Sequence, residues 1–412
     1  MPVAPLPSGN PAADAARLLG HLGLAILMIA LPLFGVVSKG AIYILLPVGA
    51  VLVFIAEVLD SGEHGARQLR LAITSGSAVA ALFLAFWAGL SLVWTPFQAE
   101  ASERFLKALG TMGFIALVAA FLPERTKPTN LYLLPVGLAL TVLAVLVMTF
   151  YDPQRIMTAS EFNESLFERS ILTLIVLVWP ALGALSLREH WVSAALLALA
   201  VAGVTMLGRA QISLAAMGAG AFTFAVAMSA PVKTARFLVV IFTPLILLAP
   251  AIPLLFHSAQ ELFGLHPEAA SPMTIWADLV ARDGLRLITG HGLDMATGAV
   301  SQGYLPVTTP KSLLFLIWYE LGAIGAIALA AFVMRAFLGA GKAPASVAPA
   351  LLAALTSVLT IAIFGLATVQ IWWVSLLGCD ILAFALLVKG VYRTKRPTSE
   401  EIEAIEEDPS QA

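Results

Sequence analysis

Two arginines in the segment 272–286 have a spacing that suits the binding of one anionic group. Arg282 and Arg286 are four residues apart, so in a helix both side chains would project from the same side. A guanidinium group forms paired hydrogen bonds with phosphate oxygens. In a helix at a membrane surface, these two residues would therefore predict recognition of a phosphorylated lipid.

Three further side chains near this pair could transfer protons or stabilise charge. His291 lies between two glycines, and imidazole groups change their charge near neutral pH, as a general base requires. Asp294 could orient that histidine or act itself. A lysine is a poor base at neutral pH unless its surroundings favour the neutral amine, so Lys311 could be either a base or a phosphate ligand. The alternative for His291 is an ordinary loop residue.

The composition indicates that these residues belong to a membrane protein. Of 412 residues, 60% are hydrophobic and 12% are charged, and the mean hydropathy is +0.93. A soluble domain carries roughly 25% charged residues, so a soluble enzyme is excluded. The formal net charge of −2 gives no basic face for nucleic acid, which is not an expected partner. With Cys379 as its single cysteine, the chain can form neither an internal disulfide nor a cysteine zinc cluster.

Twelve segments are long and apolar enough to cross a membrane as helices. A span needs about 20 mainly apolar residues, because lipid offers no partners to backbone polar groups. The sequence therefore predicts an all-α, polytopic transmembrane bundle in a domain covering 17–392. The predicted spans are 17–37, 41–58, 71–94, 105–122, 130–150, 168–187, 191–207, 210–229, 236–256, 312–337, 346–365 and 370–392.

The distribution of basic residues predicts the orientation. Cytoplasmic loops carry an excess of lysine and arginine, and a cytoplasmic N-terminus places 14 of the 23 basic residues on that side. Both termini are therefore expected in the cytoplasm, with the first apolar run retained as a span. Nine basic residues on the outer side need another explanation: Lys39, Arg104, Lys107, Arg155, Arg169, Arg209, Arg282, Arg286 and Lys311.

Two tails and one long connection lie outside the predicted spans. Residues 1–16 are expected to form a disordered N-terminus, and 393–412 a charged cytoplasmic tail. The outer, periplasmic connection 257–311 has about 55 residues, and loops this long are usually functional or disordered. From Pro272 its apolar residues recur at helical spacing, which predicts an amphipathic helix in the outer interface, with Trp276 at headgroup depth. The alternative is a lid that merely covers the bundle.

Charged residues at the outer ends of spans are further candidates. Arg209 ends an apolar segment, where a charge is costly unless it reaches the headgroups or binds a ligand. Arg169 could join a site for the same anion. Glu320 is expected to be structural and bonded to one of the outer arginines.

Four local patterns occur in order around the long connection. They are Ser91–Pro96, the Gly208-Arg209-Ala210 step, Gly290-His291-Gly292, and Glu320–Gly325 with the sequence Glu-Leu-Gly-Ala-Ile-Gly. Together they resemble the Trp-Ser-Pro, Ser-Arg-Gly, Gly-x-Gly and Glu-Leu-Gly-x-x-Gly motifs of the O-antigen ligase and O-antigen polymerase superfamily. The likeness covers roughly 85–340.

The resemblance implies a bacterial inner-membrane glycosyltransferase that uses no metal or other cofactor. Such proteins join a glycan carried on undecaprenyl pyrophosphate to an acceptor hydroxyl on the periplasmic face. This chemistry needs fixed cations where the pyrophosphate charge develops and a group that takes the hydroxyl proton. Arg209, Arg282, Arg286 and Arg169 would bind the pyrophosphate. Lys311 and Ser312 occupy the places of a His-Asn pair in the family, so the candidate catalytic residues are Lys311, His291 and Asp294.

Three functions remain open at this point. A ligase, with a lipid A core sugar as acceptor, ranks above an O-antigen or exopolysaccharide polymerase. The margin is narrow, because no motif reports which acceptor is used. The rival from another class is a secondary transporter. Transporters with twelve spans usually contain two matching halves with interrupted helices, and no such repeat is visible in the sequence.

Overall fold

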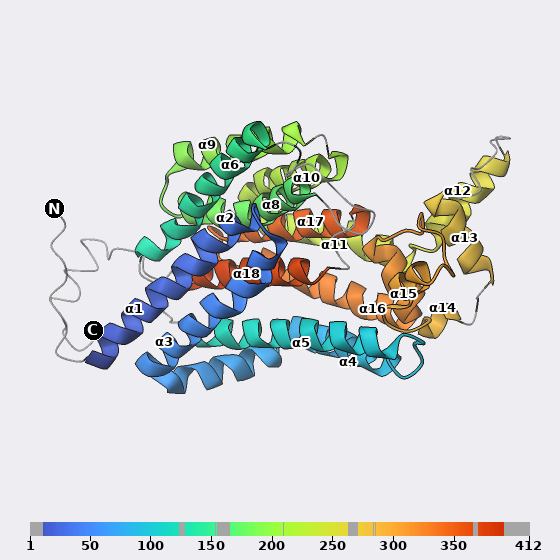
Figure 1. Ribbon diagram of the computed structural model, residues 1–412, viewed down its shortest axis with the longest axis horizontal. Helices are drawn as coiled ribbons and strands as arrows, with labels where there is room; N and C mark the ends of the chain where they lie inside the picture. Colours follow the sequence, from blue (N-terminus) through green and yellow to red (C-terminus); the bar gives the residue numbers. More distant parts are fainter. Residues whose placement is uncertain are drawn as a thin grey trace.

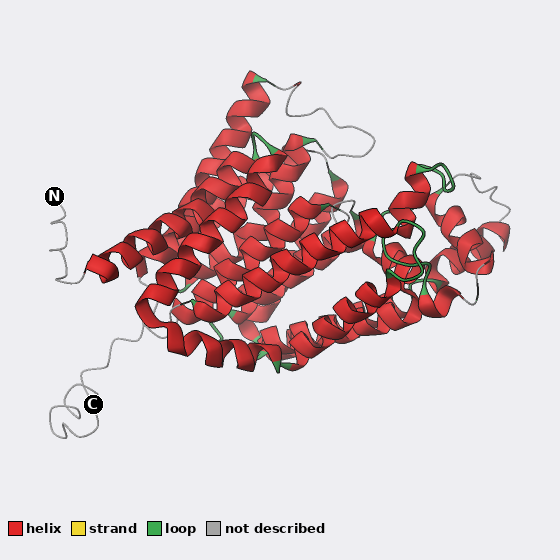
Figure 2. Ribbon diagram, turned by 60° about the horizontal axis from the view of Figure 1, so that its bottom comes forward, coloured by secondary structure: helices red, strands yellow, loops and turns green. Residues whose placement is uncertain are grey.

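The structure is a computed structural model in which every described element is a helix (Figures 1 and 2). It describes residues 11–122, 128–152, 154, 165–208, 210–262, 271–282, 284, 286–365 and 370–390. The helices are α1 (Pro11–Ala25), η1 (Ile26–Ala30), α2 (Leu31–Gly35), α3 (Lys39–Ile73), α4 (Gly76–Ser91), α5 (Gln98–Phe121), η2 (Pro128–Tyr132), α6 (Leu133–Tyr151), α8 (Leu166–Ser186), α9 (Trp191–Leu207), α10 (Gln211–Ser229), α11 (Pro231–Leu247), α12 (Ala251–Leu262), α13 (Pro272–Arg282), α14 (Arg286–Thr289), α15 (Met295–Ser301), α16 (Leu313–Gly341), α17 (Ala348–Phe364) and α18 (Ile371–Gly390).

Eight helical segments in the described part of the chain are long and apolar enough to cross a membrane. They correspond to α1–α2, the first part of α3, α5, α6 with the end of η2, α8, α10, α16 and α18. The helices α4, α9 and α17 are apolar but shorter. The all-α, multi-pass architecture expected from the sequence is therefore confirmed, whereas the count of twelve spans stays a prediction.

Among the eight candidate spans, α8 is the most buried, with 94% of an 18-residue apolar window inside the protein. Its sequence is apolar on almost every side, as expected for a helix enclosed by others, and it packs against α6, α9, α17 and α18. One hydrophobic core surrounds it, and a second core joins α4, α11 and α16 to the helices of the long loop.

Successive long helices run in alternating directions, which brings the loop helices to one end of the bundle. The indole of Trp318, near the start of α16, donates to the carbonyl of Ile246 at the end of α11. At the opposite end, Gly341 lies against Pro231. Lys389, near the end of α18, bonds to the last carbonyls of α5. The loop helices α13–α15 therefore lie at the end remote from the last residues of α18 (Figure 1).

The structure differs from the sequence prediction in several places. Helix α3 runs from Lys39 to Ile73, through the predicted gap between the spans 41–58 and 71–94. The predicted span 236–256 is divided between α11 and α12, because the chain turns between Leu247 and Ala251. The first helix begins at Pro11, inside the segment 1–16 that was expected to be disordered. Residues 1–10 and the tail 393–412 lie outside the described residues.

Candidate functional site

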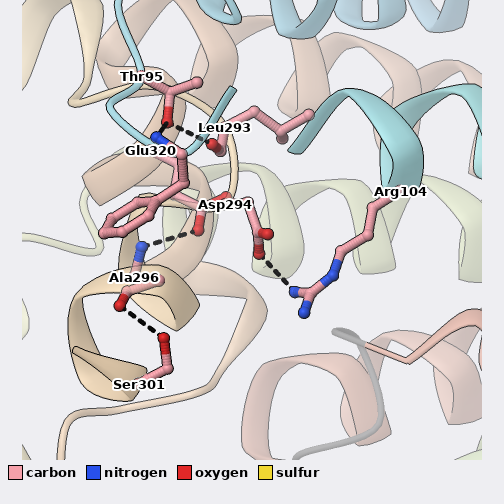
Figure 3. Close-up of polar contacts among 9 residues, drawn as sticks. Thr95, Arg104, Leu293, Asp294, Ala296, Ser301 and Glu320 are labelled. Atoms are coloured by element: carbon pink, nitrogen blue, oxygen red, sulfur yellow. Dashed lines mark hydrogen bonds and ion pairs between the residues drawn. The ribbon is translucent and has the colours of Figure 1, made fainter. Parts of the chain in front are cut away.

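Three of the four sequence patterns meet at the end of the bundle that carries the loop helices (Figure 3). The end of α4 and the turn after it, the glycine-rich turn before α15, and the first third of α16 form one contact region. Segments about 200 residues apart in the chain are joined there by hydrogen bonds.

A break in α16 makes this contact possible. Gly322 interrupts the helix with φ +67° and ψ −164°, a conformation that only glycine adopts readily. A Cβ on Gly322 would lie 2.4 Å from the carbonyl oxygen of Ile288, and a Cβ on Gly290, whose φ is +75°, would lie 2.1 Å from that of Glu320. Both glycines are therefore required for the two backbones to pass this closely.

The turn before α15 supplies donors to the carbonyls at the break. In a continuous helix each carbonyl accepts from the residue four positions later. Here the amide of His291 donates to the carbonyl of Tyr319, and that of Gly292 donates to the carbonyl of Glu320, both at 2.9 Å. The next carbonyl, of Leu321, accepts from the indole of Trp87 at 2.9 Å.

The end of α4 holds the same turn from the other side. The amide of Leu293 donates to Ser91 Oγ at 3.1 Å, and the carbonyl of Leu293 accepts from Thr95 Oγ1 at 2.9 Å. Gly292, with φ +104°, lets the turn pass Thr95, because a Cβ there would lie 2.7 Å from that of Thr95. The glycine-rich turn is therefore clamped between α4 and α16.

The clamp fixes the orientation of the imidazole of His291. Nδ1 lies 3.0 Å from the carbonyl oxygen of Tyr319, and the ring stacks on that of Tyr319 with the centroids 4.3 Å apart. A carbonyl can only accept, so Nδ1 carries the proton in the neutral ring. The acceptor lone pair is then on Nε2, the nitrogen that a general base would use.

His291 lines a small crevice that is partly open to solvent. Arg286, Trp276 and Tyr319 also line it, so the crevice combines a cation, an imidazole and aromatic rings. Trp276 is 4% exposed and packs edge-on against Phe315. Its ring therefore forms a wall of the crevice, and its position at headgroup depth stays a prediction.

Two acidic residues, Asp294 and Glu320, lie next to the clamped turn (Figure 3). Asp294 is 8% exposed and forms an ion pair with Arg104 of α5 at 2.5 Å. Glu320 Oε1 accepts from the amide of Ala296 at 3.2 Å, so it caps the first turn of α15. Burial raises the pKa of Asp294, and the Arg104 guanidinium opposes this shift.

This pairing corrects one expectation about Glu320. Its carboxylate accepts a hydrogen bond from the backbone of α15 and not from an outer arginine, while its structural role stays a prediction. The outer arginine Arg104 is bonded to Asp294 instead. The physical reason is that the start of α15 offers unpaired amides at the position of Glu320.

The two arginines predicted to act as a pair belong to different helices. Arg282 ends α13 and Arg286 begins α14, so the expectation of one shared helix face was wrong. Both side chains are exposed, but Arg286 lines the crevice, whereas Arg282 lies 4.0 Å from Asp278 in an ion pair.

The remaining predicted residues lie elsewhere or outside the described residues. Arg169 is 2% exposed, and its guanidinium stacks on Trp372 at 5.5 Å from the ring centroid. Lys311 is partly buried and immediately precedes Ser312, which caps α16. Arg209 lies outside the described residues, so its role in binding the donor stays a prediction.

Four residues of the site were not recognised as functional from the sequence: Trp87, Ser91, Thr95 and Arg104. Ser91 and Thr95 lay within a recognised pattern, but their hydrogen bonds depend on a partner about 200 residues away. Arg104 carried a usable signal, since it was one of the outer basic residues that topology left unexplained.

Comparisons with known proteins add no family to this description. No protein-family model matches the chain, and no curated protein has a significantly similar sequence. In the described residues, no three His, Cys, Asp or Glu side chains come together as a candidate metal site.

Proposed function

We propose that the protein is a membrane glycosyltransferase, which transfers a glycan from undecaprenyl pyrophosphate to an acceptor sugar hydroxyl. The observation that carries the proposal is the crevice in which His291 and Arg286 lie between aromatic walls. The imidazole can accept a proton on Nε2, the guanidinium can bind phosphate oxygens, and flat aromatic rings can pack against a sugar.

The arrangement supports a direct displacement at the anomeric carbon. The acceptor oxygen forms a bond to that carbon while the bond to the pyrophosphate oxygen breaks. Nε2 of His291 takes the hydroxyl proton, and Arg286 stabilises the charge that develops on the leaving pyrophosphate. Asp294 acts by holding the turn through its pair with Arg104. Arg209, Arg169 and Lys311 are further cations proposed for the donor, whereas Arg282, which is paired with Asp278, is proposed to lie outside the donor site.

An O-antigen ligase, with a lipid A core sugar as acceptor, is the first choice among these transferases. An O-antigen or exopolysaccharide polymerase uses the same donor head group and is the second. In both cases we propose a bacterial inner-membrane protein with cytoplasmic termini and the crevice on the periplasmic side, in contact with membrane lipids. The reaction as proposed uses no metal or other cofactor.

A secondary transporter is the candidate from another functional class, because α16 is interrupted and interrupted helices form the ion sites of transporters. In this protein, however, the carbonyls of Tyr319, Glu320 and Leu321 accept from groups of the protein itself. This hydrogen bonding favours a structural role for the break in α16, which holds the glycine-rich turn before α15, over an ion-binding role.

Substitution of the imidazole tests the proposed chemistry. His291→Gln keeps a hydrogen-bonding side chain but removes the base, so glycan transfer should fall by roughly 10²–10⁴-fold, the usual contribution of general acid–base catalysis. Lys311→Arg is the matched comparison. It keeps the charge, so activity is retained if Lys311 binds phosphate and lost if Lys311 is the base. Full activity in His291→Gln would exclude the mechanism.

A further inference from the structure

A buried carboxyl group lies in the middle of α18, far from the crevice. Asp380 is the tenth residue of this 20-residue helix and is 8% exposed. Its Oδ1 is buried and has no hydrogen-bond partner among the residues that the structure describes. Acidic residues at such depth in membrane helices are rare and usually functional.

The layer around Asp380 is uncharged. Gly378 lies against Ile115 of α5 and Leu46 of α3, and Leu387 lies against Gly183 of α8. The facing segments 40–56, 108–121 and 170–186 contain no Asp, Glu, Lys, Arg or His. Tyr43 is the titratable residue within these segments, and Cys379 precedes Asp380 on α18.

The nearest charges on the helices that pack against α18 lie toward their ends. Arg169 of α8 stacks on Trp372, eight residues before Asp380 and so about 12 Å away along the axis. On α18 itself, Lys389 bonds to carbonyls at the end of α5, including that of Leu122. Glu57 of α3 lies beyond the uncharged segment, on the same side as Lys389. None of these is at the level of Asp380.

The helix turn next to Asp380 is tightly packed and irregular. Cys379 Sγ donates to the carbonyl of Leu27 at 3.4 Å, in the π-helical turn η1. On the far side of η1, a Cβ on Gly137 of α6 would lie 2.1 Å from the carbonyl oxygen of Met28. The backbones of η1 and α6 are therefore closely packed against each other beside this turn of α18.

We propose that Asp380 is a proton-binding site that locks α18 against its neighbours. A neutral carboxylic acid is tolerated in this layer, whereas a carboxylate without a partner is far less favourable. Release of the proton therefore requires α18 to separate from η1 and α8 so that water or a cation can enter. The ligand is a proton because a metal cation needs several oxygen ligands, and Asp380 belongs to no candidate metal cluster in the described chain.

Infrared difference spectroscopy of the full-length protein in liposomes tests this proposal. At neutral pH, the difference between wild type and Asp380→Asn should contain the C=O band of a protonated carboxylic acid. The control is Glu103→Gln, since Glu103 is exposed and bonded to Lys107, and its difference spectrum should contain carboxylate bands. Carboxylate bands in the Asp380→Asn difference would overturn the proposal.

Isotope labelling of aspartate in the wild-type protein provides a measurement that does not depend on the variant folding. Incorporation of ¹³C at the aspartate carboxyl carbon should shift a protonated C=O band that persists at neutral pH. If no aspartate band of this kind is present in wild type, Asp380 is ionised and the proposal is wrong.

Discussion

The close approach of the glycine-rich turn to α16 predicts a large effect for a single added methyl group. In Gly290→Ala, the Cβ would lie 2.1 Å from the carbonyl oxygen of Glu320. Such contacts are essentially never shorter than 3.0 Å, so the two backbones must move apart by about 1 Å. The hydrogen bonds from His291 and Gly292, now 2.9 Å long, would then exceed the range of a hydrogen bond.

The expected loss of stability can be worked out from these contacts. Two broken hydrogen bonds remove about 0.5–1.5 kcal/mol each, and a positive φ on a residue other than glycine adds about 1–2 kcal/mol. Gly290→Ala should therefore destabilise the protein by about 2–5 kcal/mol. Gly303→Ala is the matched control, since Gly303 also has φ +75° but a Cβ there would meet nothing within 4 Å. It should show only the conformational part, about 1–2 kcal/mol.

Unfolding of purified variants in mixed micelles, followed by circular dichroism, measures both changes. Limited proteolysis near α15 adds a local measurement, because the released turn should be cut faster in Gly290→Ala alone. Equal destabilisation by the two substitutions would refute the reasoning, since it would mean that the contact with α16 contributes nothing.

Two further predictions concern the clamp. Ser91→Ala and Thr95→Val each remove a hydrogen bond to the backbone of Leu293. Each should reduce the free energy of unfolding by about 1–3 kcal/mol, because a buried polar group of Leu293 loses its partner. A double-mutant cycle that shows no coupling between the two substitutions would contradict a common clamp. Arg104→Gln should destabilise the protein by roughly 1 kcal/mol, a small value because Arg104 is 46% exposed. Burial raises the pKa of Asp294 above its unfolded value. The folded protein is therefore less stable once Asp294 must ionise, as the pH rises above about 4, and it loses more stability without Arg104. Unfolding at several pH values should show this trend in Arg104→Gln and not in Arg104→Gln combined with Asp294→Asn.

The sequence predicted the helical fold because hydropathy and length directly reflect the requirements of a membrane span. Four patterns were recognised in order around the long loop, and the structure brings three of them into contact. The glycine patterns were informative because each glycine allows an approach that a Cβ would block, as at Gly290 and Gly322.

The details of the site depended on contacts that a sequence does not show. The break at Gly322 in α16 was not predicted, since the apolar residues on both sides give no sign of it. The break is stable only because donors from His291, Gly292 and Trp87 reach it from other parts of the chain. In the same way, the helix that would have joined Arg282 to Arg286 ends between them, and only the structure shows which of the two lines the crevice.

The most direct test of the proposed transferase is the glycan product of cells that lack the protein. In a deletion strain complemented with wild type, Arg286→Ala or Arg282→Ala, lipopolysaccharide on gels should be capped with wild type, uncapped with Arg286→Ala, and largely capped with Arg282→Ala. Lipid-linked polymer should accumulate wherever capping is lost, whereas a single attached repeat would indicate a polymerase. Unchanged lipopolysaccharide and exopolysaccharide in the deletion strain, together with gradient-driven solute uptake by the purified protein, would contradict glycan transfer.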